Sequence, residues 1–199
     1  MSNFDEVNIL IKERNIDILC ISETWLLQHT PDASIRIPNY KIYRCDNGRG
    51  SGVCMYVNDL LQSHIIDTNI TKIRGIEDIC VQIQLRKLPS FIIGCIYRHP
   101  KAPTNAWDYI TDLFRSVLLR KKTMYVLGDL NDDILSRKCQ LSRIVTNNKL
   151  TQVIDKPTRI TPTSATLLDV IITNNPDTII KSEVSPQAIA DHDLVGNHD

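Results

Sequence analysis

The chain has 199 residues, of which 42% are hydrophobic and 23% are charged. These values are typical of globular proteins and exclude a disordered chain, and the length is sufficient for one domain with a sizeable core. Lysine plus arginine and aspartate plus glutamate number 23 each, which excludes a global positive field that draws a protein non-specifically onto nucleic acid.

The chain is predicted to open with a helix and a strand. Phe4, Val7 and Leu10 recur at helical spacing, which predicts a short helix. Residues 16–21 form a nearly continuous apolar run, typical of a strand that is buried on both faces. This strand would deliver the segment SETW, residues 22–25, to its C-terminal end.

Alternating hydrophobicity predicts an antiparallel hairpin in the middle of the chain. A glycine-rich turn at residues 48–52 precedes a strand predicted over residues 53–57. Residues 79–85 alternate between apolar and polar, and residues 91–97 return as a partner strand. The second half is predicted to hold a helix over about 105–120, a strand over 124–127, a helix near 141–150, a Pro/Thr-rich loop over 156–166 and a strand over 167–173.

This mixture of antiparallel hairpins and connecting helices favours an α/β sandwich over a purely parallel wound sheet. The sequence shows no internal repeat and no interdomain linker. We therefore expect a single domain over residues 1–199.

The cysteines and the N-terminus indicate the compartment. The six cysteines form no C-x-x-C pair and most lie in apolar runs, which favours buried thiols in a reducing compartment over disulfides. Residues 1–6 show no cationic start followed by an apolar stretch, and no apolar run approaches membrane-spanning length. We expect a soluble, intracellular protein with no membrane partner.

Polar residues gather where the predicted strands end, which is where sites are usually built. Each of these segments alone has an ordinary explanation, such as a solvated carboxylate or a common Gly-Asp turn. Their order and their shared place at strand ends favour a site. The segments are Ser22-Glu23-Thr24, Tyr97-Arg98-His99-Pro100, Gly128-Asp129-Leu130-Asn131, Leu168-Asp169-Val170 and Asp191-His192.

In chain order, these segments resemble the active-site motifs of the endonuclease/exonuclease/phosphatase family. The wording SETWL, CIYRHP, GDLN, PTR with a following LLDVIITN, and DHDLVG is similar to the nucleases of jockey-like non-LTR retrotransposons, over nearly the whole chain. The resemblance implies a DNase I-like α/β fold, in which two β-sheets form a sandwich flanked by helices.

The residue types also suit the chemistry of that family. In-line attack of water on a phosphodiester requires a positioned nucleophile, counter-charge for the phosphate oxygens and help for the leaving oxygen. A hard oxygen ligand such as Glu23 suits Mg²⁺. Asp129 is expected to be ionised at neutral pH with an ordinary pKa, and His192 is of the residue type that titrates near neutral pH and can neutralise or protonate a phosphate oxygen.

The resemblance implies a role for each motif residue. Glu23 and Asp191 would bind the metal, Mg²⁺ or alternatively Mn²⁺. Asp129 would polarise the attacking water, and Asn131 would hold substrate or water beside it. Asp169 would orient the imidazole of His192.

Other residues are candidates for contact with substrate. Tyr97 would, by the resemblance, donate its hydroxyl to the phosphate; alternatively its ring simply closes the core. Trp25 could stack on a base or wedge a groove, although a tryptophan after a buried strand is more often packing. Local pairs of cations could hold a nucleic-acid backbone, although charged loop residues are usually only solvated: Arg44 with Arg49, Arg98 with Lys101, and Lys156 with Arg159.

The sequence departs from the family pattern at both ends. Family members carry an asparagine at the end of a first strand, ahead of the helix that opens this chain. Ala190 stands where the family often has serine, and after Asp191-His192 the closing strand is expected to be cut short. We therefore expect an incomplete domain, either a decayed fragment or a part of a larger polyprotein in which a reverse transcriptase follows.

The leading functional prediction is a Mg²⁺-dependent DNA endonuclease that nicks target DNA as the first step of retrotransposon insertion. Its partner would be DNA, its location the nucleus if it acts on genomic DNA, and its state a monomer or part of the polyprotein. Two alternatives stay open: a phosphatase or phosphodiesterase of the same fold, and a non-catalytic remnant.

Overall fold

A computed structural model describes residues 4–185 and 192–198. The helices are α1 (Phe4–Arg14), α2 (Ala106–Leu118) and α3 (Gln140–Asn147), with short 3-10 helices η1 (Asp32–Ile35) and η2 (Pro176–Thr178). The strands are β1 (Ile18–Ser22), β2 (Tyr40–Cys45), β3 (Val53–Asn58), β4 (Gln62–Ile65), β5 (Ile76–Gln84), β6 (Phe91–Arg98), β7 (Thr123–Asp129), β8 (Thr151–Gln152), β9 (Arg159–Thr161), β10 (Ser164–Thr166), β11 (Asp169–Thr173), β12 (Lys181–Ser185) and β13 (Leu194–His198). Within the described residues, no helix combines the length and the apolar character needed to cross a lipid bilayer.

Two β-sheets form the centre of the fold. The smaller has the strand order β1-β3-β2 and the larger the order β4-β5-β6-β7-β11-β8. Apolar side chains from both sheets, such as Met55 of β3, Val81 of β5 and Cys95 of β6, form one buried cluster. All pairings in these sheets are antiparallel except β6 with β7, which α2 connects. The predicted α/β sandwich is confirmed.

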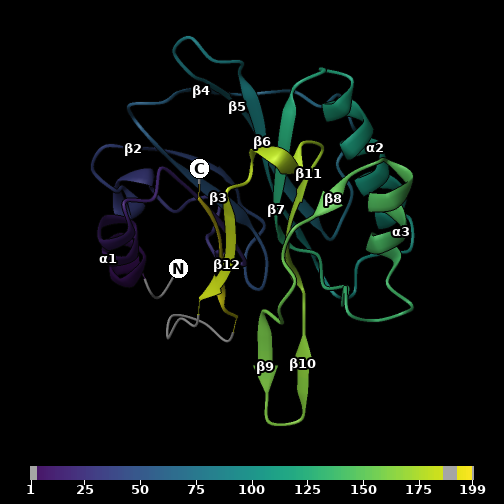
Figure 1. The fold of residues 1–199 in the computed structure, drawn as a ribbon. Coiled ribbons are helices and arrows are strands. Elements are labelled where there is room, and N and C mark those ends of the chain that lie inside the picture. The colour runs from purple at the N-terminus through teal and green to yellow at the C-terminus, as the bar shows by residue number, and fades with distance from the viewer. Residues whose placement is uncertain (1–3, 186–191, 199) are drawn as a thin grey trace.

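Helices flank the sandwich on both outer sides (Figure 1). On one side, α1 packs Ile11 against the smaller sheet, in a cluster that includes Tyr56 of β3. On the other side, α2 and α3 cover the larger sheet, and α2 buries Ile110 and Phe114 against it. Burial of these apolar stripes fixes the helices to the sheets and leaves the strand ends open for polar residues.

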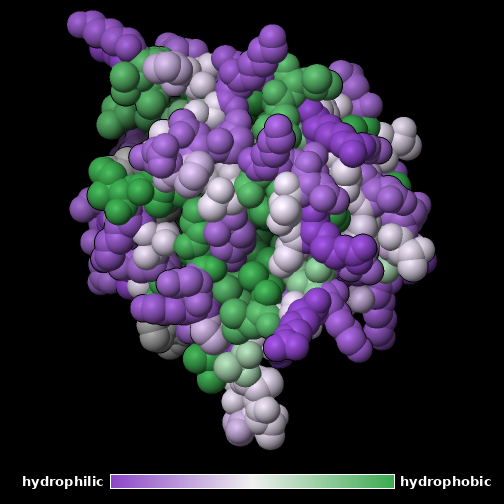
Figure 2. Space-filling view, turned by 45° about the vertical axis from the view of Figure 1, so that its right-hand side comes forward, coloured by the Kyte–Doolittle hydropathy of each residue, from purple (hydrophilic) through white to green (hydrophobic). Residues whose placement is uncertain are grey.

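The hairpin β9–β10 corrects one prediction of the sequence analysis. Residues 156–166 were expected to form a loop, whereas β9 and β10 pair in antiparallel register and project from the body (Figure 1). The Thr161 hydroxyl closes the turn by accepting the Ser164 backbone N–H at 3.0 Å. In Figure 2 the hairpin protrudes at the lower edge, below a hydrophobic area on a mostly hydrophilic face.

The first strand of the chain also differs from its prediction. β1 was expected to be buried on both faces, but it lies at the edge of the smaller sheet and only Leu19 of its residues is buried. The last strand in the described residues is the five-residue β13, and whether the closing strand is cut short stays a prediction. It pairs with β12 over the full length of both strands.

Candidate active site

The Gly-Asp pair at the end of β7 depends on a close approach between two strands. Gly128 has φ = 143°, and a Cβ atom placed on it would lie 1.8 Å from the Ile96 carbonyl oxygen of β6. Only glycine fits this contact. The next residue, Asp129, is paired across the sheet with Asp169 at the start of β11. Strand register therefore brings two predicted site residues side by side.

Asn131 holds the Asp129 carboxylate in place. The Asn131 backbone N–H donates to Asp129 Oδ1 at 2.7 Å, and Asn131 Nδ2 donates to Oδ2 at 3.1 Å. The same amide nitrogen lies 3.0 Å from the Arg98 carbonyl oxygen, and Asn131 itself has a left-handed backbone with φ = 48°. Both carboxylate oxygens of Asp129 thus receive a donor from one residue, a type that tolerates this conformation.

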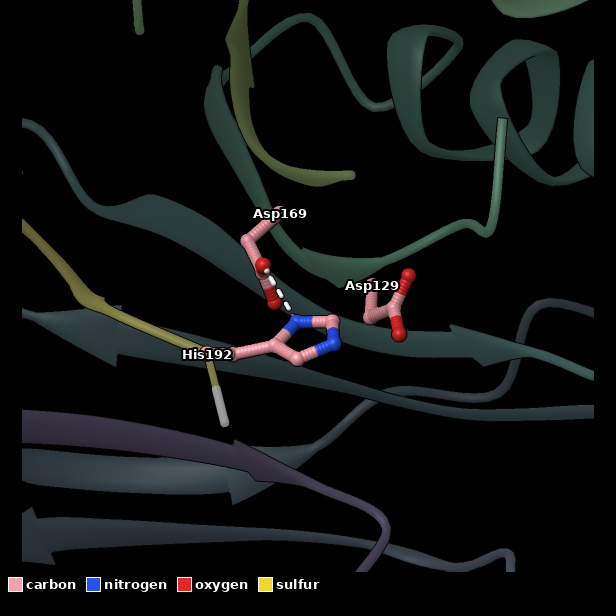
Figure 3. A group of neighbouring side chains, drawn as sticks. All are labelled: Asp129, Asp169 and His192. Carbon is pink, nitrogen blue, oxygen red and sulfur yellow. Dashed lines mark hydrogen bonds and ion pairs between the residues drawn. The ribbon is translucent and has the colours of Figure 1, made fainter. Parts of the chain in front are cut away.

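His192 and Asp169 form the pair that the motifs predicted. His192 Nδ1 and Asp169 Oδ2 are 2.7 Å apart, and Figure 3 shows the second ring nitrogen on the side of the imidazole nearer Asp129. An ionised carboxylate can only accept, so Nδ1 carries the proton of this hydrogen bond. The carboxylate therefore fixes the tautomer and the orientation of the ring.

Thr158 is a positioning residue for which the sequence analysis assigned no role. Its side chain is fully buried, and its hydroxyl oxygen accepts the backbone N–H groups of Leu168 and Asp169, each at 3.1 Å. Its carbonyl oxygen accepts the Asp193 N–H at 2.7 Å. Thr158 therefore ties the segments that carry Asp169 and His192 to each other. The sequence feature that could have pointed to Thr158 is the PTR motif, in which it is the second residue.

The electrostatics of Asp129 correct another expectation. Burial, followed by the charge of Asp169, raises the pKa of Asp129 to about 7, whereas an ordinary carboxyl pKa was expected. Hydrogen bonding from Asn131 and the charge of His192 act in the opposite direction. The physical reason is that Asp129 is nearly solvent-free beside a second carboxylate. At neutral pH Asp129 is therefore poised between its protonated and ionised forms.

Glu23 lies just beyond the end of β1 and is held by Tyr97. The Tyr97 hydroxyl donates to Glu23 Oε1 at 2.6 Å. Tyr97 is buried in the cluster between the sheets, and burial and the Glu23 carboxylate keep its pKa well above the usual value for tyrosine. Its ring therefore closes the core, as the alternative prediction held, while its hydroxyl positions Glu23. Contact of that hydroxyl with a phosphate stays a prediction.

The Glu23–Tyr97 pair and the Asp129–Asp169–His192 group are electrostatically coupled. The charge of Glu23 raises the pKa of Asp129, and the charge of Asp129 raises that of Tyr97. β6, β7 and β11, which carry Tyr97, Asp129 and Asp169, are consecutive neighbours in the larger sheet. Among the predicted site residues, Asp191 lies outside the described residues.

The site offers oxygen and nitrogen ligands for a metal ion. One ligand atom each from Asp129, Asp169 and His192 lies within 4.8 Å of the others. Glu23 adds a solvent-exposed carboxylate, which can coordinate a hard cation that keeps several waters. Burial is the largest cause of the raised pKa of Asp129, and repulsion by the Asp169 carboxylate and, less strongly, by the Glu23 carboxylate adds to it. A divalent cation would offset that repulsion, so the donor set fits one.

The predicted DNA-contacting residues divide into two groups. Arg44 forms ion pairs with Asp32 and Asp46, and Arg98 stacks over Trp107 with its guanidinium carbon 4.4 Å from the ring centre. These contacts tie the two arginines to the fold, and their contact with a nucleic-acid backbone stays a prediction, as does that of the half-buried Arg159. Arg49, Lys101 and Lys156 are exposed, as is Trp25 beside Glu23, and their roles stay predictions.

Comparisons with known proteins place this geometry among related folds. A family model described as "Endonuclease/Exonuclease/phosphatase family" matches residues 3–192. Among curated protein sequences, no match was found.

Solved structures share the fold at low identity. The endonuclease domain of TRAS1, a telomere-specific non-LTR retrotransposon, has 17% identity and a TM-score of 0.72, with 96% of this chain and 89% of that chain covered. A 3'-5' exonuclease from Neisseria meningitidis has 14% identity and a TM-score of 0.73, with 98% and 94% covered. A mannosyl-6-phosphatase from Bacteroides thetaiotaomicron has 13% identity and a TM-score of 0.62, with 98% and 89% covered.

Proposed function

Because the chain belongs to the endonuclease/exonuclease/phosphatase family, we propose that it is a Mg²⁺-dependent DNA endonuclease. The motif wording of retrotransposon nucleases and the likeness to the TRAS1 endonuclease domain support DNA as the substrate. In this proposal the protein nicks target DNA in the nucleus as the first step of retrotransposon insertion. It acts as a monomer or within a polyprotein that includes a reverse transcriptase.

The observation that carries the proposal is the convergence of residues far apart in the sequence. Asp129, Asp169 and His192 meet at one strand end, and Glu23 is coupled to them through its charge. Hydrolysis of a phosphodiester needs a water-activating carboxylate, a positioned cation or proton donor and a metal ligand in one place. A scattered arrangement of the same residues could not do this.

Asp129 is the residue proposed to activate water. A general base works best when its pKa is near the working pH, and the pKa of Asp129 is raised to about 7. Asn131 fixes both carboxylate oxygens, so the base keeps one orientation toward an incoming water molecule. The proton of the attacking water would move to a carboxylate oxygen of Asp129.

His192 is proposed to neutralise the negative charge that develops on the phosphate during the reaction. Its Nδ1 proton is held by Asp169, which stabilises the imidazolium form electrostatically. The ring can then donate to a phosphate oxygen as negative charge accumulates there. Thr158 keeps Asp169 in position for this role through the backbone.

Glu23 is proposed to bind Mg²⁺, with Asp191 as the second ligand by family resemblance and Mn²⁺ as the alternative ion. The exposed carboxylate of Glu23 keeps room for the waters that Mg²⁺ retains. When bound, the ion would supply counter-charge to the phosphate oxygens. Tyr97 holds one oxygen of Glu23 and so limits the orientations of this ligand.

A paired assay tests the proposal against its alternatives. Nicking of supercoiled plasmid, measured beside phosphate release from monoester substrates, separates an endonuclease from a phosphatase of the same fold. The endonuclease proposal predicts Mg²⁺-dependent open-circle product and little free phosphate. A folded protein, verified by a cooperative melting transition, that produces neither product would be the non-catalytic remnant.

A further inference from the structure

Arg98, the last residue of β6, reaches from the strand that carries Tyr97 to the loop that follows Asp129. Its Nη1 donates to the Leu130 carbonyl oxygen at 3.3 Å and to the Asn131 carbonyl oxygen at 3.4 Å. In return, Asn131 Nδ2 donates to the Arg98 carbonyl oxygen at 3.0 Å. One arginine therefore contacts two successive carbonyl groups in the loop that orients the proposed base.

The first of these contacts acts on the peptide unit that serves Asp129. The Leu130–Asn131 peptide bond is trans, so its C=O and N–H bonds lie in one plane and point in opposite directions. Arg98 binds the C=O of this unit, and Asp129 Oδ1 accepts its N–H at 2.7 Å. Arg98 and Asp129 thus hold opposite sides of the same peptide plane.

The backbone of Asn131 needs such support because it lies in the left-handed region, with φ = 48°. This conformation is unfavourable for residues other than glycine, although asparagine tolerates it better than most. Rotation of the peptide plane by about half a turn would bring φ to an ordinary negative value. The same rotation would turn the Asn131 N–H away from Asp129. The peptide unit therefore has a second orientation, in which the carboxylate loses one of its two donors.

The guanidinium of Arg98 is itself held from the side of α2. Its central carbon lies 4.4 Å from the centre of the Trp107 ring, and α2 packs on the larger sheet. Burial lowers the pKa of Arg98, and the charges of Asp132 and then Asp129 act in the opposite direction. Its Nε is buried and has no hydrogen-bond partner among the described residues. Because an unpartnered buried donor is destabilising, an arginine is a costly way to stabilise this loop and fits a functional role better.

We propose that Arg98 is a positioning residue that locks the peptide unit between Leu130 and Asn131, with its N–H directed at Asp129. Trp107 supplies the face on which the planar guanidinium stacks, and the two N–H bonds of Nη1 reach the two carbonyl oxygens. The expected effect on nicking rests on the proposed endonuclease function. The direction of the peptide unit does not rest on it.

Hydrogen exchange of the Asn131 amide, followed by NMR in EDTA, tests the proposal without catalysis. In wild type this N–H is bonded to Asp129 and should exchange slowly. Arg98→Met keeps a long side chain but removes both donors, so the exchange should accelerate about tenfold, the size of one hydrogen bond. Arg120→Met is the matched control, because Arg120 donates to the backbone carbonyl of Asp67 beyond the C-terminal end of α2. It should leave the exchange of the Asn131 amide unchanged.

Nicking kinetics separate positioning from contact with DNA. As a positioning residue, Arg98 predicts that Arg98→Met lowers kcat by about tenfold to a hundredfold at unchanged KM. The slope of DNA affinity against salt concentration should also stay unchanged. Arg98→Lys keeps the charge but lacks the planar face that stacks on Trp107, so it should lose part of both kcat and the Asn131 protection. A phosphate contact would instead raise KM and reduce the salt slope by about one in Arg98→Met.

Three results would overturn the proposal. The first is wild-type exchange of the Asn131 amide in both folded Arg98 variants. The second is a raised KM at unchanged kcat, and the third is a lower melting temperature with unchanged exchange and kcat. If Arg98→Met does not fold, Arg98→Lys alone decides by the same measurements. Slow Asn131 exchange that depends on Arg98, in a protein that never nicks plasmid, would refute the endonuclease and leave the positioning role standing.

Discussion

Asp129 and Asp169 are directly paired across the antiparallel strands β7 and β11, so that two carboxylates share one end of the larger sheet. A cross-strand pair of like charges is destabilising unless something offsets it. Here His192 is bound to one carboxylate and Asn131 to the other. Repulsion between the two carboxylates remains, and a bound cation or a proton taken up by Asp129 can relieve it. Several predictions about stability and activity depend on this repulsion.

The raised pKa of Asp129 predicts a pH-dependent stability. The folded pKa is about 7 and the ordinary value is 3.8. The folded state favours the protonated form of Asp129. The contribution of this protonated carboxyl to the stability of the fold is therefore full below the ordinary pKa and is lost as the pH rises through the folded pKa. In EDTA, Asp129→Asn, which cannot ionise, should be more stable than wild type by roughly 2 to 4 kcal/mol at about pH 8.

Urea unfolding at about pH 8 and about pH 4 checks this, since the advantage of Asp129→Asn should disappear at the lower pH. Asp177→Asn, an exposed change on η2 beyond the opposite end of β11, is the matched control and should follow wild type at both pH values. An advantage of the same size at both would contradict the pKa assignment.

Tyr97→Phe tests whether the Tyr97 hydroxyl positions Glu23 or contacts the phosphate. The ring and its packing remain, but Glu23 loses its 2.6 Å partner. The Mg²⁺ concentration for half-maximal nicking should rise about tenfold, as expected when a residue supporting a metal ligand is removed, and saturating Mg²⁺ should restore most of the rate. Tyr56→Phe, which removes another buried hydroxyl, should leave the Mg²⁺ dependence unchanged. A deficit that persists at saturating Mg²⁺ would instead show that Tyr97 contacts the phosphate.

Thr158→Val tests the positioning of Asp169. The substitution keeps the shape but removes the oxygen that accepts two backbone N–H groups, at a cost of about 1 to 3 kcal/mol in stability. Because Asp169 orients His192, the pH–rate profile of nicking should shift as well. Thr158→Ser should recover both properties. If stability falls but the pH profile is unaltered, Thr158 serves the fold only.

Gly128→Ala should be among the most destabilising small substitutions in the chain. Its Cβ would meet the Ile96 carbonyl oxygen, so β6 and β7 would have to separate, with a loss above about 3 kcal/mol. Gly50→Ala has a positive φ of 71° but meets no atom within 4 Å, and should cost only about 1 kcal/mol. Equal melting temperatures for the two variants would argue against the close strand contact.

Much of the fold could be predicted because the spacing of apolar residues reveals which face of a helix or strand is buried. The stripe on α2 and the alternation in β5 reflect burial of one face, and both elements were found within a few residues of their observed ends. The hairpin β9–β10 was missed because its strands are exposed and polar, so no hydrophobic period marks them. β1 was expected to be buried on both faces because an apolar run does not reveal which strands pair with it.

The site was predicted in part for a related reason. Motif order found Asp129, Asp169 and His192, which the structure brings together. The sequence could not show that burial raises the pKa of Asp129, or that Tyr97 directs its hydroxyl to Glu23, because both depend on packing between strands distant in the chain. Thr158 was overlooked because its role is hydrogen bonding to backbone, which leaves little trace in residue type.

The most direct test of the central claim is conversion of supercoiled plasmid to open circle by wild type, Asp129→Asn and His192→Ala, with Mg²⁺ and with EDTA. Convergence of these residues on one phosphate predicts nicking by wild type with Mg²⁺ only, and a loss of about a hundredfold or more in each variant. Asp177→Asn should nick like wild type. Undiminished nicking by either site variant, or nicking that persists in EDTA, would contradict the account.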